Sequence, residues 1–70
     1  MMPLTFANVN EENTVLKITG GSAVKKHLEN LGFVPGSSIA IISSIGGDLI
    51  VRVKGARIAI SREMAAKIMV

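Results

Sequence analysis

Hydrophobic and polar residues alternate over residues 49–54 and 57–60 in the second half of the chain, and this period of two predicts β-strands. Residues 38–43, which are rich in isoleucine, predict a further strand before them. The segments between them contain Gly47 and Gly55, and glycine supplies the positive φ angles that tight hairpin turns need. We therefore expect three consecutive antiparallel strands joined by two hairpin turns.

The first half of the chain predicts a helix between two strands. Val24, Leu28 and Leu31 form one apolar stripe at helical spacing, which indicates a helix over about residues 23–31. Ser22 precedes this stripe and is the expected N-cap. Before it, residues 13–19 alternate loosely and predict a short strand.

The end of this helix and the turn after it are specified by four residues. Gly32 stands where a left-handed residue commonly closes a helix, because it has no Cβ to clash there. Phe33 follows at the position that folds back on the last turn. Pro35 and Gly36 are the pair favoured at the centre of a type II turn. The region therefore predicts a helix, a sharp end, a turn and then a strand.

A second, C-terminal helix is expected over about residues 62–67, with Ser61 as its N-cap. The chain of 70 residues then reads as one domain, 1–70, made of several short strands and two short helices. A small open sheet leaves exposed edges, and curling into a barrel reduces them. We predict a mainly β fold, a small and partly open SH3-like barrel.

The composition restricts the chemistry that the chain can carry. There is no cysteine and only one histidine, which excludes disulfides and thiolate metal sites. Glu11 and Glu12 are adjacent and would face opposite ways on a strand, and the other acidic residues are scattered, so we expect neither a metal site nor a cofactor. No nucleophile elbow or phosphate-binding loop is present, so we expect no catalytic residues and a protein that is not an enzyme.

An uncharged interval between Glu29 and Asp48 raises the question of a membrane span. A spanning helix needs about 20 predominantly apolar residues, whereas this interval is rich in serine and glycine and contains Pro35. The N-terminus also lacks the basic start and long apolar run of a signal peptide. We expect a cytoplasmic protein.

The pattern Leu28-x-x-Leu31-Gly32-x-x-Pro35-Gly36 resembles the FeoA family, the small cytoplasmic partner of the bacterial ferrous iron transporter FeoB. The likeness continues over about residues 14–70 through three further elements: Gly47-Asp48-Leu49-Ile50-Val51, Gly55 before Arg57, and Ala59-Ile60-Ser61-Arg62. The resemblance implies an SH3-like barrel that binds a partner protein and has no chemistry of its own.

Lys25, Lys26, His27 and Leu28 are the candidate partner-binding residues. The two lysines fall in the first turn of the expected helix, where the positive end of the helix dipole disfavours cations. Either the two lysines face an acidic partner surface, or they are surface residues whose small loss of helix stability is tolerated. Leu28 is either a core residue or part of a docking groove on the flank of the helix.

Arg52, Lys54 and Arg57 would lie close together if Gly55 turns a hairpin, and they form a candidate basic patch. Small barrels that bind RNA usually pair such a patch with aromatic side chains for base stacking. This chain has no Tyr or Trp and only Phe6 and Phe33. A solvated strand face is therefore the other interpretation, and we expect no nucleic acid as partner.

The leading hypothesis is a non-enzymatic accessory protein of ferrous iron uptake that binds the cytoplasmic region of a FeoB-type transporter. It would be peripheral to the membrane only through that partner. The alternatives are a small basic barrel that binds RNA and an SH3-like regulatory module for another protein. Pairing of the predicted strand 38–43 between copies leaves an oligomer open.

Overall fold

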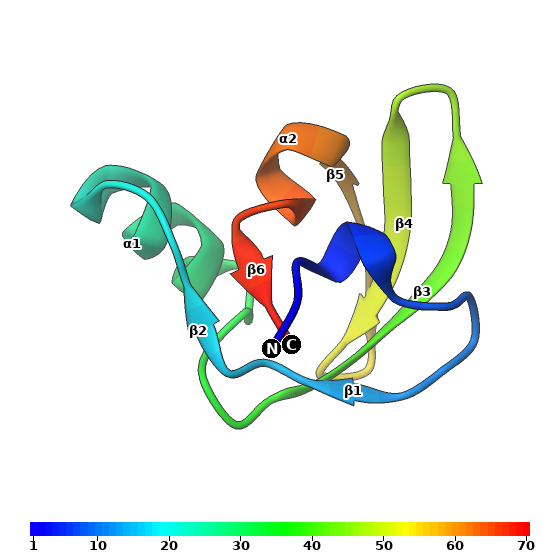
Figure 1. Cartoon of the computed structure of the whole chain (residues 1–70), viewed down its shortest axis with the longest axis horizontal. Coiled ribbons are helices and arrows are strands. Elements are labelled where there is room, and N and C mark those ends of the chain that lie inside the picture. The colour runs from blue at the N-terminus through cyan, green and yellow to red at the C-terminus, as the bar shows by residue number, and fades with distance from the viewer.

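The computed structural model describes residues 1–70, and a meander of three antiparallel strands dominates it (Figure 1). These strands are β3 (Ser38–Ile45), β4 (Asp48–Val53) and β5 (Ala56–Ser61). Leu49, Val51 and Val53 alternate into the core, as the period of two predicts. The three strands expected from the sequence are confirmed.

The two hairpin turns differ in their use of glycine. Lys54 and Gly55 both have positive φ, 50° and 76°, between β4 and β5. Between β3 and β4, Gly46 has φ 60°, whereas Gly47 has no positive φ. Gly46 and Gly47 are the two turn residues between the paired Ile45 and Asp48, so the expected positive φ is found at Gly46 and is wrong for Gly47.

The strand predicted over residues 13–19 is split between two sheets. β1 (Asn13–Thr14) pairs with β3, and β2 (Lys17–Ile18) pairs with β6 (Ile68–Met69). The chain changes sheet at Val15, whose N–H donates to Ser37 O at 2.9 Å, and Leu16 N–H then donates to Met69 O at 2.8 Å. The single strand expected over residues 13–19 is therefore two short strands with a bend between them, since β1 pairs with β3 and β2 pairs with β6.

The four-stranded sheet has the order β1-β3-β4-β5, and the two-stranded sheet is β2-β6. β3 is therefore an interior strand. Val9 and β1 cover its other edge over residues 38–41, which leaves residues 38–43 poorly suited to pairing between copies. The outer edge of β5 has no neighbour, and the sheet does not close into a full barrel. The prediction of a mainly β, partly open fold is confirmed.

Short helical segments connect and cover these sheets. They are η1 (Leu4–Phe6), a 3-10 turn; α1 (Ser22–Asn30), after β2; and α2 (Arg62–Ala65), after β5. Ser61 Oγ accepts a 3.2 Å hydrogen bond from Met64 N–H, which confirms Ser61 as N-cap. α2 ends before residue 67, because the chain turns at Ala66 and Lys67 to begin β6. No helix has the length and apolar character needed to cross a membrane.

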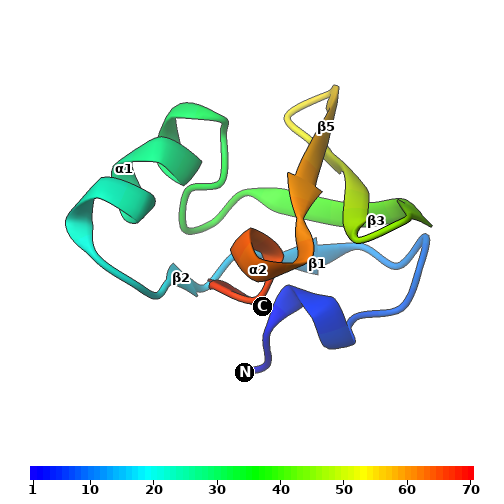
Figure 2. The ribbon, with the colours of Figure 1, turned by 90° about the horizontal axis from the view of Figure 1, so that it is seen from above.

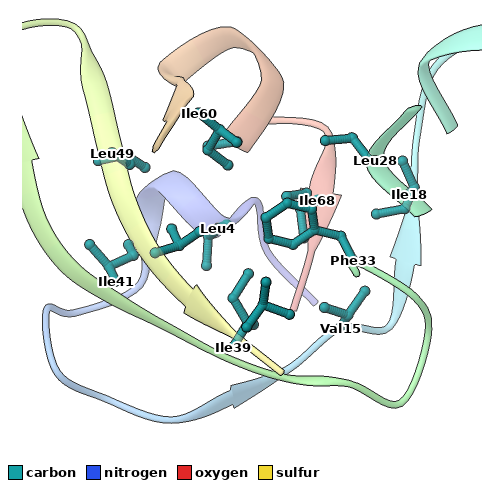
Figure 3. Packing of buried hydrophobic residues seen from close by; sticks show 13 residues of the cluster. Leu4, Val15, Ile18, Leu28, Phe33, Ile39, Ile41, Leu49, Ile60 and Ile68 are labelled. Atoms are coloured by element: carbon teal, nitrogen blue, oxygen red, sulfur yellow. The ribbon is translucent and has the colours of Figure 1, made fainter. Parts of the chain in front are cut away.

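One core lies between the sheets, and Figure 3 shows how elements from the whole chain contribute to it. No polar or charged residue is buried. The cluster joins the N-terminal turn, α1, the segment after α1, both sheets and α2. Its members are Leu4, Val15, Ile18, Leu28, Phe33, Ile39, Ile41, Leu49, Val51, Val53, Ile60, Ala65 and Ile68.

Candidate functional site

Helix α1 contacts the rest of the molecule through one side only. Leu28 is completely buried, and Val24 and Leu31 pack partly buried against the core. Lys25, Lys26 and His27 are exposed. Figures 1 and 2 both show α1 at one side of the molecule, away from the β3–β4 hairpin. The helix therefore presents its charged residues to solvent, while Leu28, with Val24 and Leu31 beside it, anchors it to the core.

Leu28 belongs to the anchor and not to the exposed face. Its exposed fraction is 0%, so its side chain is not part of the molecular surface. The possibility that Leu28 lines a docking groove is corrected on this ground, and its interpretation as a core residue is confirmed. Lys25, Lys26 and His27 remain as the surface candidates on α1.

The beginning of α1 also differs from expectation. Gly21 is the N-cap, with φ −74°, and no side chain caps the helix. Ser22 is the first helical residue, so its prediction as N-cap is wrong. Lys25 N–H already donates to Gly21 O at 3.0 Å, which places both lysines at or beyond the end of the first turn. The dipole penalty is weaker there, because it decays within the first turn.

The end of α1 follows the sequence closely. Phe33 N–H donates to Leu28 O and Gly32 N–H donates to Glu29 O, both at 3.0 Å, which is the hydrogen-bond pattern of a Schellman motif. Gly32 takes φ 108° and Gly36 takes φ 93°. Ser37 N–H donates to Val34 O at 3.0 Å across Pro35 and Gly36. The predicted motif is confirmed, and its role is to hold α1 against the core.

Two further lysines lie on the β2–β6 side of the molecule, one on β2, just before α1 in the chain, and one directly before β6. Lys17 is opposite Met69, and Thr19 N–H donates to Lys67 O at 2.7 Å, so Lys17 and Lys67 share the outer face of β2–β6. The Cδ atom of Lys67 lies 3.5 Å from the place of a Cβ on Gly20, next to Val24. We call Lys17, Lys25, Lys26 and Lys67 the lysine surface. Glu29 is the one acidic residue on α1.

The predicted basic patch is assembled only in part. Arg52 and Arg57 are directly opposite each other on β4 and β5. However, the Arg52 guanidinium donates to Glu12 at 2.8 Å. Lys54 lies in the turn, and its Cδ atom is 3.6 Å from the place of a Cβ on Gly32. In the patch, Arg52 is thus neutralised by Glu12, and the aliphatic stem of Lys54 lies beside Gly32. Arg57 is the cation without an acidic partner.

Glu12 is an acidic neighbour of the basic patch that the sequence did not reveal. Its carboxylate accepts from Ser38 Oγ at 2.6 Å and from Arg52 at 2.8 Å. The hydrogen bond from Ser38, then that from Arg52, and the positive charge of Arg52 hold the pKa of Glu12 below its ordinary value. No local signal marks this pair, because it depends on the position of β1 beside β3.

Two hollows lie on the surface, and small-molecule pockets are predominantly apolar. The hollow beside the ion pair is lined by polar residues and glycine only: Glu12, Ser37, Ser38, Arg52, Lys54 and Gly55. The other has one hydrophobic residue among its lining: Gly47, Asp48, Ser61, Arg62, Glu63 and Ala66. Phe33 is fully buried and does not serve as a stacking platform, whereas Phe6, on η1, is 72% exposed. No group of three or more His, Cys, Asp and Glu side chains is placed to hold a metal ion.

Comparison with known proteins identifies relatives over the whole chain. The family model described as the FeoA domain matches residues 2–70. A curated protein of Methanocaldococcus jannaschii, named "Putative Fe(2+) transport protein A", is 41% identical over 70 residues, which is 100% of this chain and 85% of the relative.

Solved structures show the same fold. The crystal structure of an iron uptake regulatory protein (FeoA) is 30% identical, has a TM-score of 0.87 and covers 96% of this chain and 89% of that chain. A zinc complex of FeoA from Stenotrophomonas maltophilia, described as a prokaryotic SH3 domain protein, is 23% identical, with a TM-score of 0.85 over 99% of this chain and 88% of that chain. The predicted SH3-like fold is confirmed.

Proposed function

We propose, from the premise that this chain belongs to the FeoA family, that it binds the cytoplasmic region of a FeoB-type transporter and supports ferrous iron transport without catalysing a reaction. The protein would act in the cytoplasm and reach the membrane through this partner. Family membership supports the connection with ferrous iron transport. What supports a binding role is the pair of exposed cations Lys25 and Lys26 on one helix.

The observation that carries the proposal is the exposure of Lys25 and Lys26 on a helix fixed by the buried Leu28. A helix anchored on one side presents its opposite side in a defined orientation, so little ordering is needed on binding. Lys17 and Lys67 extend the same positive region onto β2–β6. The docking partner is therefore an acidic surface, and opposite charges steer the encounter.

The test compares two double variants with the same change of charge. Lys25→Glu with Lys26→Glu reverses the exposed cations of α1, and Lys54→Glu with Arg62→Glu reverses two exposed cations outside α1. Binding to the purified cytoplasmic region of a FeoB-type transporter is measured by titration calorimetry. We expect the α1 variant to bind at least about tenfold more weakly, and the control to bind within about twofold of wild type.

Circular dichroism and the melting temperature check that both variants are folded. A folded α1 variant that binds as tightly as wild type would move the docking surface away from α1. Absence of binding by the wild-type protein at low ionic strength would overturn the proposed function itself.

A further inference from the structure

Strand β5 has one free edge. It is the last strand of the sheet order β1-β3-β4-β5. Arg62 directly follows the strand, and its N–H donates to Gly47 O, just before β4, at 3.0 Å. Because the direction of backbone groups alternates along a strand, the N–H and C=O groups of Arg57 and Ala59 point away from β4. These groups have no backbone partner in the chain.

Little protects this edge from another strand. Proteins usually shield a free edge with proline, a bulge, a covering segment or charged side chains. β5 runs unbroken over Ala56–Ser61, contains no proline, and pairs with β4 without a register shift. Its one charged side chain is that of Arg57, and Ala59 is small and exposed. Of these protective features, β5 itself therefore carries only the charge of Arg57.

The two faces of β5 define what a complementary strand needs. Ile58 is opposite the buried Val51 and packs partly buried against the core. An added strand should therefore place an apolar side chain on this inner face, beside Ile58. On the outer face Arg57 is directly opposite Arg52, and like charges in such a pair are destabilising. Glu12 neutralises Arg52 and leaves Arg57 without an acidic partner.

We propose that the free edge of β5 binds an extended acidic segment of another protein as an added strand, with an acidic side chain beside Arg57 and an apolar one beside Ile58. Main-chain hydrogen bonds to Arg57 and Ala59 supply the pairing, and the alternating side chains supply the selectivity. A second copy of the chain fits less well, because each copy has a net charge of +3 and pairing would bring two cationic edges together.

This inference goes beyond the docking of α1 and uses a different surface. It is tested with an acetylated and amidated heptapeptide in which valine and glutamate alternate; the control peptide has lysine in place of glutamate. Amide hydrogen exchange is followed by NMR in the full chain. We expect the glutamate peptide to slow exchange at Arg57 and Ala59 at least about tenfold, and the lysine peptide to leave it unchanged.

Two variants distinguish strand addition from simple charge attraction. Ala59→Pro removes an N–H that lies outside the β4–β5 ladder, and proline is tolerated at such an edge position; we expect binding at least about tenfold weaker. Arg57→Glu keeps the backbone intact and should reverse the preference toward the lysine peptide. This second variant provides the test if Ala59→Pro does not fold.

The inference is overturned by a saturating glutamate peptide that leaves both amides unprotected, or by a folded Ala59→Pro variant that binds like wild type. A dimer with the same two amides protected in the absence of peptide would identify a second copy as the occupant and overturn it as well. Lys25→Glu with Lys26→Glu should bind the peptide like wild type, so this test and that of α1 docking fail independently.

Discussion

Arg52 and Glu12 form an ion pair across the outer face of the sheet, with 2.8 Å between guanidinium and carboxylate and 40 positions between them in the chain. Ala40 lies opposite Arg52 on β3 and is buried, yet it is not part of the core cluster. The register places it between the two charged residues, so the arginine side chain passes over it. The pair ties the segment before β1 to β4.

We expect the stabilising effect of Glu12 to depend on pH. Its pKa is lowered in the folded protein relative to the ordinary value near 4.5, so the charged form favours folding above that value. This contribution is lost as the pH falls through the lower folded-state pKa. Glu12→Gln should therefore be less stable than wild type at pH 7, and the difference in melting temperature should shrink at pH 3.

Both side chains of this pair are about half exposed, 49% for Arg52 and 58% for Glu12. Water and salt therefore screen the interaction, and the effect should decrease with added salt. Glu11→Gln, which removes the neighbouring charge without an ion pair, is the control. An equal loss of stability in both variants at pH 7 would contradict a specific role of Glu12.

Leu28→Ala should destabilise the protein by about 2–5 kcal/mol, because it opens a cavity beneath α1 where Leu28 is completely buried. This is a large part of the roughly 3–10 kcal/mol expected for a domain of this length. The matched control is Leu16→Ala, since Leu16 is 51% exposed. Urea unfolding measures both free energies, and equal values would contradict the anchoring role of Leu28.

Gly32→Ala should cost about 1–2 kcal/mol, because a residue with a Cβ is strained at φ 108°. The added Cβ itself would meet only ordinary contacts, the nearest being Lys54 Cδ at 3.6 Å. Gly47→Ala is the control, since Gly47 has no positive φ and nothing lies within 4 Å of its Cβ position. Chemical denaturation measures the free energy of unfolding of both variants, and Gly47→Ala should change it much less than Gly32→Ala.

Ser61→Ala should lower the free energy of unfolding by about 1 kcal/mol, because it removes the acceptor for Met64 N–H at the start of α2. Ser22→Ala should have almost no effect, since Ser22 caps nothing and alanine is a good helix former. Thermal unfolding compares the two. A loss of stability in Ser22→Ala equal to that in Ser61→Ala would contradict this assignment of the caps.

The two serines show how far local signals reach. Both precede an apolar helical stripe, and the sequence predicts the same role for each. Ser61 caps α2, but at α1 the chain enters the helix one residue earlier, at Gly21. Glycine is itself acceptable as an N-cap, so residue preference alone did not decide between Gly21 and Ser22.

The candidate sites show the same limit. The turn at Gly55 brings Arg52 and Arg57 together as predicted, because a two-residue hairpin fixes its own register. The pairing of Arg52 with Glu12, and the position of Lys67 beside α1, depend on elements far apart in the chain. Burial of Leu28 likewise follows from how α1 meets the core.

The sequence by itself determined the helix end at Gly32, the turn at Gly36 and the alternating strands of the meander, because each depends on backbone preferences within a few neighbouring residues. Only the tertiary structure decided that residues 13–19 divide between two sheets, that β6 exists, and which charges remain unpaired. Strands of two residues, such as β1, β2 and β6, carry almost no preference of their own, so their hydrogen-bond partners elsewhere in the chain define them.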